Sequence, residues 1–250
     1  MTRTRMLRRL VPAVVILFTV ATDAATPELI DIRTPIPDVV LDIRYFTAHN
    51  FVGDPIDGYE APKCLLSPAA AAALAEVQGA LRPRGLSLKI YDCYRPQRAV
   101  DHFVAWAEDV DDQRMKAEFY PGVDKQNLFR DGYIAARSSH SRGSTVDLTI
   151  VPVPTPDQSA FDPNGPLRSC ENPVGERFAD NSVDMGTGFD CFSPLSHTLN
   201  PMIAGAAHEH RLLLKSLMEE NGFKNLAEEW WHYTLADEPY PHSYFDVPVQ

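Results

Sequence analysis

The order of the periodic segments constrains the fold of this 250-residue chain more than any other feature. Ser67 is placed as a helix N-cap, Pro68 stands at the first helical position, and AAAAALAEVQGAL follows. Pro83 and Gly85 end this helix, and LSLKIYD then alternates as a strand does. Helices and strands do not alternate regularly along the chain, which predicts an α+β domain with a small central antiparallel sheet flanked by helices.

The remaining elements follow from periodicity and composition. In chain order they are a strand at 39–45, a helix in RPQRAVDHFVAWAEDV, a short helix at 115–119, a strand in STVDLTIV, a helix at 202–220 and a strand in WWHYTL. Residues 151–200 are rich in Pro, Asn, Asp, Gly and Ser and show little periodicity. A loop this long in a compact domain is usually functional or an insertion.

Residues 1–24 have the features of a signal peptide. MTRTRMLRRL carries four arginines, VPAVVILFTVA is apolar, and TDAAT offers small residues for cleavage after Ala24 or Ala25. The apolar run is too short for a comfortable membrane span, which needs roughly 20 residues. An uncleaved N-terminal anchor is the alternative. We therefore expect a mature domain at 25–250 that is exported, periplasmic or secreted, with no stable membrane association.

The net charge argues against nucleic-acid partners. The formal net charge of the whole chain is −11, and cleavage after Ala24 would remove four arginines and Asp23, which leaves about −14. Such a surface repels nucleic acid and anionic lipid. We expect no nucleic-acid role.

Four cysteines lie in the exported part, which favours disulfides and allows three pairings. We predict Cys64 with Cys93 and Cys170 with Cys191, because each pair brackets one segment. A cysteine-ligated metal site is the competing interpretation, and the lack of any CxxC spacing in the sequence counts against it.

The first candidate site is SSHSRGSTVDLTI, residues 138–150. His140 precedes a turn marked by Gly143, and Asp147 lies on the polar face of the strand that follows. A histidine and an aspartate brought together by a turn can both reach one cation, and zinc accepts both ligand types. From this segment alone, a solvated turn with a capping aspartate is the alternative.

The second candidate site is AEEWWHY, which sets Glu228 and Glu229 beside two tryptophans. With His232 as a third ligand, the set becomes the two histidines and one carboxylate of a catalytic zinc, which leaves a position for water. Glu229 would take a proton from that water, and the tryptophans would exclude solvent and raise its pKa. Glu229 and His232 point to opposite faces of a regular strand, so a bend is required here. A core strand with an acidic edge is the alternative.

Together the motifs resemble the zinc peptidases of the D-alanyl-D-alanine dipeptidase family, the vancomycin-resistance VanX type. They are SxHxxGxxxD, ExWH, YDCYRPQRAV, MGTGFD and the tail EWWHYTLADEPYPHSYFD, and the similarity covers nearly all of the mature chain. The resemblance implies hydrolysis of D-alanyl-D-alanine to two D-alanines, with one zinc ion per chain and attack by the metal-bound water.

The resemblance also implies roles for individual residues. Three match the family's zinc ligands: His140, Asp147 and His232. Glu229 matches the general acid/base, and Arg95 matches the arginine that stabilises the oxyanion of the transition state. Three more match substrate contacts on a looser alignment: Asp190, Ser138 and Tyr45. Asp190 would hold the substrate's ammonium group and restrict the enzyme to short substrates.

The chain departs from the cytoplasmic members of this family in two ways. It carries a signal peptide, and the connection at 151–190 is enlarged, with Cys170 and Cys191 bracketing much of it. A disulfide there would stabilise the enlarged loop near the active-site mouth and could change which substrates enter.

Two other functions are consistent with these residues. One is a related D,D-carboxypeptidase that acts on longer peptidoglycan stems, and the other is a non-catalytic, zinc-stabilised wall-binding module. The presence of both Glu229 and Arg95 argues against the second. Export away from the cytoplasmic precursors favours D-alanine scavenging in cell-wall peptide turnover over antibiotic resistance.

Overall fold

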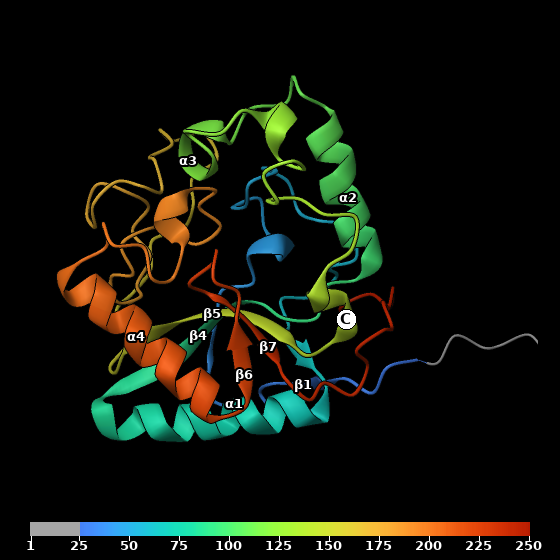
Figure 1. Cartoon of the computed structure of the whole chain (residues 1–250), viewed down its shortest axis with the longest axis vertical. Coiled ribbons are helices and arrows are strands. Elements are labelled where there is room, and N and C mark those ends of the chain that lie inside the picture. The colour runs from blue at the N-terminus through green and yellow to red at the C-terminus, as the bar shows by residue number, and fades with distance from the viewer. Residues whose placement is uncertain (1–25) are drawn as a thin grey trace, which may run out of the picture.

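The computed structural model describes residues 26–250, and the predicted signal peptide at 1–24 lies outside that range. The body of the molecule is one sheet with helices on one face and helices and long loops on the other (Figure 1). This arrangement confirms the predicted α+β class and the single domain. Among residues 26–250, no helix has the length and apolar character needed to cross a membrane.

The main sheet has five strands in the order β2-β4-β5-β7-β6. Strands β4, β5, β7 and β6 pair antiparallel, as predicted, and the structure adds one parallel pair at the edge, β2 with β4. A separate antiparallel pair is formed by β1 and β3. The strands are β1 (Ile30–Asp31), β2 (Val40–Leu41), β3 (Leu65–Leu66), β4 (Leu86–Asp92), β5 (Thr145–Pro152), β6 (Phe223–Asn225) and β7 (His232–Leu235).

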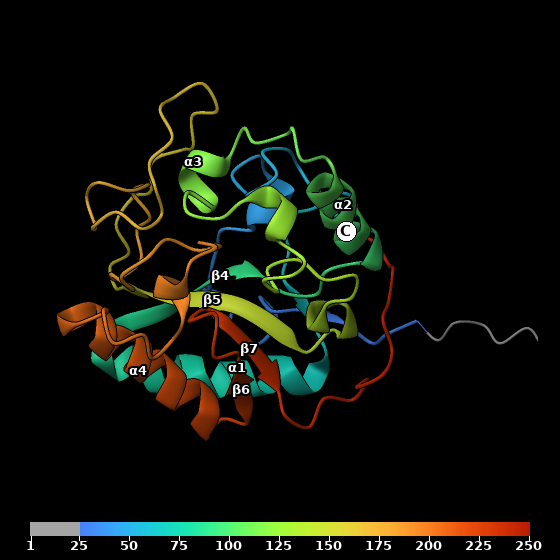
Figure 2. The same ribbon diagram turned by 45° about the horizontal axis from the view of Figure 1, so that its top comes forward.

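The helices form two groups. Helices α1 and α4 pack against each other, α1 contacts β4, and α4 contacts β6, so this pair covers one face of the sheet. Helices α2 and α3 lie on the other side, among the loops (Figures 1 and 2). The helices are α1 (Pro68–Leu81), α2 (Gln97–Glu108), α3 (Lys116–Phe119) and α4 (Gly205–Glu220). Short 3₁₀ helices occur at Arg44–Phe46, Arg82–Arg84, Lys125–Asn127, Ser139–Arg142 and Pro194–Ser196.

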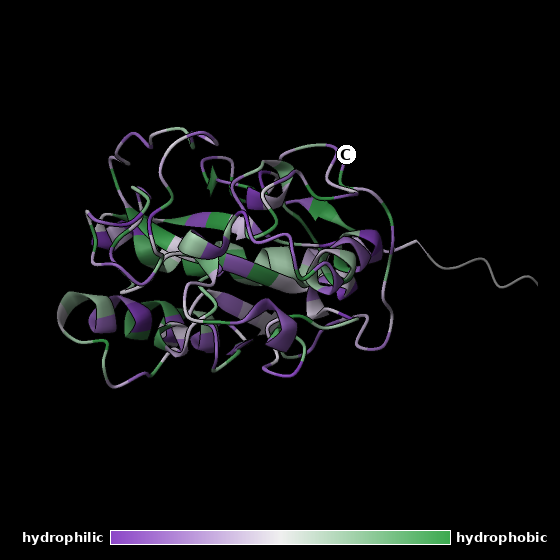
Figure 3. Ribbon diagram, turned by 90° about the horizontal axis from the view of Figure 1, so that it is seen from above, coloured by the Kyte–Doolittle hydropathy of each residue, from purple (hydrophilic) through white to green (hydrophobic). Residues whose placement is uncertain are grey.

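The central strands are buried on both faces. In β5, the apolar side chains of Val146, Leu148 and Ile150 are fully buried, and so are those of Asp147 and Thr149 on the face predicted to be polar. The second face is buried because the layer of loops and helices opposite α1 and α4 covers it (Figure 2). In Figure 3 the helices carry bands of both hydrophobic and hydrophilic residues, as expected for helices with one buried face.

Several predicted elements are confirmed and three boundaries differ. Ser67 caps α1 by accepting the N–H of Ala70 at 3.3 Å. The strand predicted at 39–45 is wrong beyond Leu41, because Arg44–Phe46 turn into a 3₁₀ helix that buries its first two side chains. Helix α4 begins at Gly205 rather than at 202, and the two tryptophans form a turn before β7 instead of its first residues.

Both predicted disulfides are present. Cys64 bonds Cys93, which joins the start of β3 to the end of β4. Cys170 bonds Cys191, which joins the long loop after β5 to the segment that precedes α4. All four cysteines are buried.

A buried charge cluster ties the same long loop to the sheet. Lys89 of β4 lies with its ammonium 2.9 Å from Asp180 Oδ1 and 3.0 Å from Asp42 Oδ2. Arg44 donates to Asp42 at 2.9 Å and to Asp180 at 2.8 Å. Two cations and two carboxylates therefore neutralise each other beneath the loop, which lets the charged side chain of Lys89 lie inside the sheet.

Candidate metal centre and substrate cavity

His140 is held in one orientation by the backbone of a neighbouring strand. It lies in the 3₁₀ helix Ser139–Arg142, which ends at Gly143 with φ of +81°, a conformation that favours glycine. The Nδ1 atom of His140 lies 2.6 Å from the carbonyl oxygen of Cys93. Because only an N–H can bond a carbonyl, Nδ1 carries the proton, and Nε2 is the free nitrogen that faces the cavity.

Strand pairing brings Asp147 and His232 together. Asp147 of β5 stands directly opposite His232 of β7 in the antiparallel register. The Nδ1 atom of His232 lies 3.1 Å from Asp147 Oδ1, and Nε2 of His140 lies 3.2 Å from Asp147 Oδ2. The same two nitrogens are 3.3 Å apart. One ligand atom from each residue therefore fits within a sphere small enough for a single metal ion, since all lie within 4.8 Å of one another.

The chemistry of these three residues fits a metal ion. Asp147 Oδ1 is buried and accepts no hydrogen bond from residues 26–250, despite its closeness to His232. An unpaired buried carboxylate oxygen is costly unless a cation satisfies it. Burial lowers the pKa of His140, which favours the neutral imidazole that a metal requires. Two imidazole nitrogens and one carboxylate match the ligand set of catalytic zinc sites.

Glu229 reaches the same place from the turn before β7. The predicted bend is present: the N–H of Glu229 bonds the carbonyl of Leu226 at 3.0 Å, and the N–H of His232 bonds that of Glu229. Glu229 Oε2 consequently lies 3.4 Å from Nδ1 of His232. Partial burial raises the pKa of the Glu229 carboxyl, although the neighbouring His232 opposes the change.

The tryptophans beside Glu229 anchor the turn and do not enclose the carboxylate, as the sequence had predicted they would. Trp230 and Trp231 point into the core, and the indole N–H of Trp230 donates to Thr187 Oγ1 at 2.8 Å. The Glu229 side chain points the other way and is 29% exposed. The two aromatic rings therefore anchor the turn, and the carboxylate lies in a solvent-accessible cavity rather than in a dry wall.

Arg95 follows β4 and points its guanidinium at the cluster of His140, Asp147 and His232. It donates to Asp92 Oδ2 at 2.9 Å and lies 3.5 Å from Asp147 Oδ2. Its guanidinium carbon also stands 4.9 Å from the centroid of the Tyr45 ring, within cation–π distance. Asp92 is fixed in turn by the hydroxyl of Tyr59 at 2.6 Å. The guanidinium is therefore held in place from several sides.

Asp190 sits in a tight turn and lines the same cavity. It has φ of +55°, in the left-handed region that non-glycine residues rarely adopt. Its buried carboxylate accepts the hydroxyl hydrogen of Tyr45 at 2.8 Å. Burial, and then the charge of Asp147, raise the pKa of Asp190 well above its usual value. This carboxylate would therefore gain from a bound cation.

One cavity of about 410 Å³ brings these groups together. Its size is within the usual range of small-molecule sites. It is lined by all eight residues singled out from the sequence: Tyr45, Arg95, Ser138, His140, Asp147, Asp190, Glu229 and His232. Their shared cavity is an observed arrangement, whereas the role of each remains a prediction.

Sequence reasoning missed three supporting groups. Ser139 Oγ lies 3.2 Å from Nε2 of His232, the nitrogen that does not face the cluster. Asp92 orients Arg95, and the Cys93 carbonyl orients His140. Ser139 and Asp92 adjoin or lie within the quoted motifs, so their position was a usable signal. A backbone carbonyl gives no signal in the sequence.

Comparison with known proteins defines the class of this chain and then its family. The model of the family described as D-ala-D-ala dipeptidase matches residues 25–154 and 178–250, which makes the chain a peptidase. A D-alanyl-D-alanine dipeptidase of Streptomyces coelicolor is 39% identical over 83% of this chain and 91% of its own length. One of Enterococcus faecalis is 38% identical over the same shares, and one of Escherichia coli is 33% identical over 84% and 86%. The chain belongs to the D-Ala-D-Ala dipeptidase family.

The unmatched segment 155–177 is shorter than the predicted enlargement at 151–190. It contains Cys170 but not Cys191. None of its residues lines the main cavity described above. The predicted disulfide nevertheless joins this segment through Cys170 to Cys191, the neighbour of the cavity-lining Asp190, and its effect on substrate entry stays a prediction.

Proposed function

We propose that this protein is a zinc-dependent dipeptidase that hydrolyses D-alanyl-D-alanine to two D-alanines. The single observation that carries the proposal is the convergence of His140, Asp147 and His232 beside Glu229 in one cavity. Family membership supports the choice of dipeptide, because the relatives that match are D-alanyl-D-alanine dipeptidases.

The ligand set would hold zinc through His140 Nε2, Asp147 and His232 Nδ1. When bound, zinc supplies a Lewis acid that acidifies water and polarises the scissile carbonyl. The Cys93 carbonyl and Ser139 would keep the two imidazoles oriented, since each bonds the ring nitrogen that points away from the cluster.

Glu229 would move the proton. Its Oε2 is 3.4 Å from Nδ1 of His232, so a water held beside the ligand set would lie within hydrogen-bonding reach of the carboxylate. As general base, Glu229 takes the proton from the attacking water, and as general acid it passes that proton to the leaving amine. Its partial exposure allows water to enter before each turnover.

Arg95 would stabilise the negative charge that develops on the substrate's carbonyl oxygen. The guanidinium is already oriented by Asp92 and by the Tyr45 ring, so little reorganisation is needed when charge appears. Asp147 shares its carboxylate between this guanidinium and the two histidines. Arg95 is thus held beside the ligand set, where the carbonyl oxygen would develop its charge.

Asp190 would bind the free ammonium group of the substrate. Its carboxylate is buried, has one hydrogen bond from Tyr45, and faces the same cavity as Glu229. Ser138 lines the cavity beside His140 and would add a further polar contact. A buried anion in the same cavity as the ligand set would favour substrates whose amino terminus lies close to the scissile bond, as it does in a dipeptide.

We further propose that the chain is exported and recycles D-alanine during cell-wall turnover. The proposal rests on the signal-like residues 1–24 and on two disulfides, which persist in oxidising compartments.

The test is D-alanine release by the purified 25–250 chain. D-alanyl-D-alanine should yield two D-alanines per dipeptide, a chelator should stop the reaction, and added zinc should restore it. Faster release of D-alanine from a stem pentapeptide than from the dipeptide would instead identify a D,D-carboxypeptidase. Binding to peptidoglycan without release from either substrate would reject catalysis altogether.

A further inference from the structure

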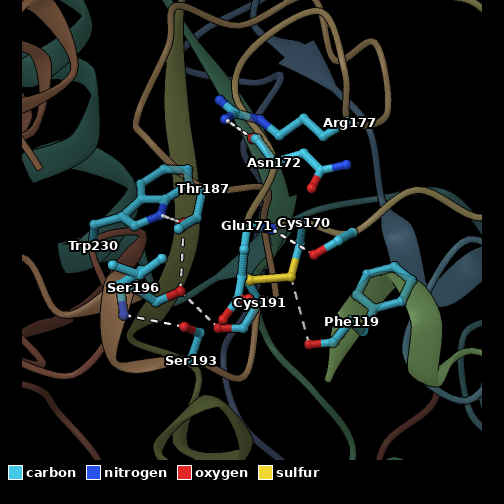
Figure 4. The surroundings of a disulfide bond; sticks show 12 residues. Phe119, Cys170, Glu171, Asn172, Arg177, Thr187, Cys191, Ser193, Ser196 and Trp230 are labelled. Atoms are coloured by element: carbon cyan, nitrogen blue, oxygen red, sulfur yellow. Dashed lines mark hydrogen bonds between the residues drawn. A yellow bond between two sulfur atoms is a disulfide. The ribbon is translucent and has the colours of Figure 1, made fainter. Parts of the chain in front are cut away.

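The disulfide between Cys170 and Cys191 joins a residue of the long loop to the neighbour of Asp190, which lines the substrate cavity. Cys191 directly follows Asp190 in the chain, whereas Cys170 belongs to the segment 155–177 that the family model does not match. Figure 4 shows the bond between the sulfur atoms of Cys170 and Cys191. A feature outside the family pattern is thus bonded to the residue beside the proposed ammonium site.

Cys170 also fastens its surroundings through backbone hydrogen bonds. Its N–H donates to the carbonyl of Glu118 at 2.9 Å, and its carbonyl accepts the N–H of Gly188 at 2.9 Å. Two residues beyond Asp190, the N–H of Phe192 donates to the carbonyl of Phe119 at 2.8 Å. The turn at 188–192 is therefore tied to the end of α3 on both sides of Asp190, with Cys170 between them.

The opposite side of this turn is tied to the segment that carries Glu229. Ser196 Oγ donates to the carbonyl of Cys191 at 2.6 Å, and Thr187 accepts the indole N–H of Trp230 at 2.8 Å (Figure 4). The backbone N–H of Trp230 also bonds the carbonyl of Ser196 at 3.1 Å. On the side toward α3, the disulfide bonds the turn to Cys170, whose N–H is bonded to Glu118 of α3.

The backbone of Asp190 needs such support. Its φ of +55° is unfavourable for a residue with a Cβ, so the conformation persists where surrounding contacts fix it. The carboxylate meets the Tyr45 hydroxyl in this conformation, at 2.8 Å. A change of the backbone to an ordinary conformation would swing the carboxylate away from Tyr45 and from the cavity.

We infer that the Cys170–Cys191 disulfide is a positioning element that holds the Asp190 carboxylate in the cavity for the substrate's ammonium group. The ammonium role of Asp190 rests on the proposed function. The tether, by which the disulfide holds the turn at 188–192, does not depend on that function. The disulfide acts on substrate binding and leaves Glu229 and the metal ligands in place, because these residues have anchors of their own. Asp147 and His232 are paired in β5 and β7, and the backbone of Glu229 is bonded to Leu226 and to Asn225.

The first experiment replaces both cysteines, as Cys170→Ser/Cys191→Ser, with Glu176→Gln as the control from the exposed part of the same segment. The KM for D-alanyl-D-alanine should rise about tenfold, as expected when a charge-assisted hydrogen bond is weakened, while kcat changes little. Discrimination against the N-acetylated dipeptide should fall, because that substrate lacks the ammonium. Glu176→Gln should match the wild type in both readouts.

Asp190→Asn gives the second readout. If the disulfide acts through Asp190, adding the two serines to Asp190→Asn should raise KM little further, so the effects should be strongly non-additive. Fully additive effects, or a loss of kcat at unchanged KM, would overturn the inference. Lower zinc content in the double-serine variant would indicate a general loss of structure. It would contradict the inference, which requires the metal ligands to stay in place.

Amide hydrogen exchange tests the tether independently of activity. In the double-serine variant the amides of Gly188 and Phe192 should exchange faster, whereas those of β5 should not change. Equal exchange at 188–192 in both proteins would overturn the tether. If the wild type releases no D-alanine, the proposed function fails, and the exchange result still decides whether the disulfide holds this turn.

Discussion

At the scale of single residues, the site depends on side chains that are each oriented by a partner. Burial and His232 act in opposite directions on the Glu229 carboxyl, and the net effect raises its pKa. Glu229→Gln keeps the shape of the side chain but removes the basic oxygen, so kcat should fall by about 10²- to 10⁴-fold. Zinc content, measured on the same preparation, should stay at one ion per chain.

Glu228→Gln is the matched control for that substitution. Glu228 is the adjacent carboxylate, it is exposed, and it does not line the cavity. Its kcat should equal that of the wild type. A Glu229→Gln protein that turns over at the wild-type rate would exclude Glu229 as the proton carrier, and a loss of zinc in that variant would reassign it to the metal.

At this scale, the sequence was most informative where residue type and spacing together match a known kind of site. His140, Asp147 and His232 were identified from residue type and spacing, and the bend between Glu229 and His232 followed from strand geometry. The exposure of Glu229 was not predictable in this way. Adjacent tryptophans suggest a dry environment, yet the turn sends the rings into the core and the carboxylate into the cavity.

At the scale of secondary-structure elements, strand β4 holds the site from behind. The Cys64–Cys93 disulfide fixes the end of β4, and the Cys93 carbonyl accepts the Nδ1–H of the His140 imidazole. Replacing both cysteines by serine should lower the free energy of unfolding by about 3.5 kcal/mol, as expected for a closed loop of this length. Zinc affinity should also fall, by about tenfold, because an orienting hydrogen bond is loosened.

Two measurements separate these effects. Denaturant unfolding of the zinc-free proteins gives the stability loss, and competition with a chelator gives the zinc affinity. The Cys170–Cys191 serine variant is the comparison, since its disulfide has no contact with a metal ligand and should leave zinc affinity unchanged. Equal zinc affinity in the Cys64–Cys93 variant and the wild type would show that the carbonyl keeps its place without the bond.

The long loop after β5 is joined to the sheet by charge. Burial alone would raise the pKa of Asp180, but Lys89 and Arg44 outweigh it and lower that pKa below its usual value. A carboxylate with a lowered pKa stabilises the fold above its unfolded-state value of about 3.9 and loses this contribution as the pH falls further. Asp180→Asn should therefore cost about 3 kcal/mol at pH 7 and less near pH 3.

Denaturant unfolding at the two pH values measures the change. Asp131→Asn, which removes an exposed ion pair with Arg130, is the control and should have a much smaller effect. A stability difference between Asp180→Asn and the wild type that stays constant from pH 7 to pH 3 would show that the charge of Asp180 does not stabilise the loop.

Element boundaries mark the limit of prediction from sequence. Helix α1 and strand β4 have strong local signals, a capped start and a regular alternation, and they were located correctly. The segment at 39–45 has apolar residues suited to a strand, but the buried charge cluster draws Arg44 into a 3₁₀ helix. That contact joins residues 136 positions apart, and such distant partners leave no local pattern.

At the scale of the whole molecule, a metal ion at this site would link the two parts of the chain that form it. His140 and Asp147 come from the middle of the chain, and His232 comes from near its end. One ion would therefore join three elements: the 3₁₀ helix Ser139–Arg142, β5 and β7. A ligand that binds the native state alone stabilises it by about 4 kcal/mol at 1,000 times its dissociation constant. For a domain of this size, zinc at that concentration should raise Tm by roughly 10 °C.

Thermal unfolding with chelator and with restored zinc measures this shift, and two variants assign it to the site. Glu229→Gln should keep the full shift although it is inactive, because the carboxylate is not needed to bind the ion. His232→Ala should lose most of the shift, because only two ligands remain. The same rise of Tm in His232→Ala as in the wild type would show that zinc binds elsewhere in the molecule. The proposed mechanism, which requires zinc at this site, would then be wrong.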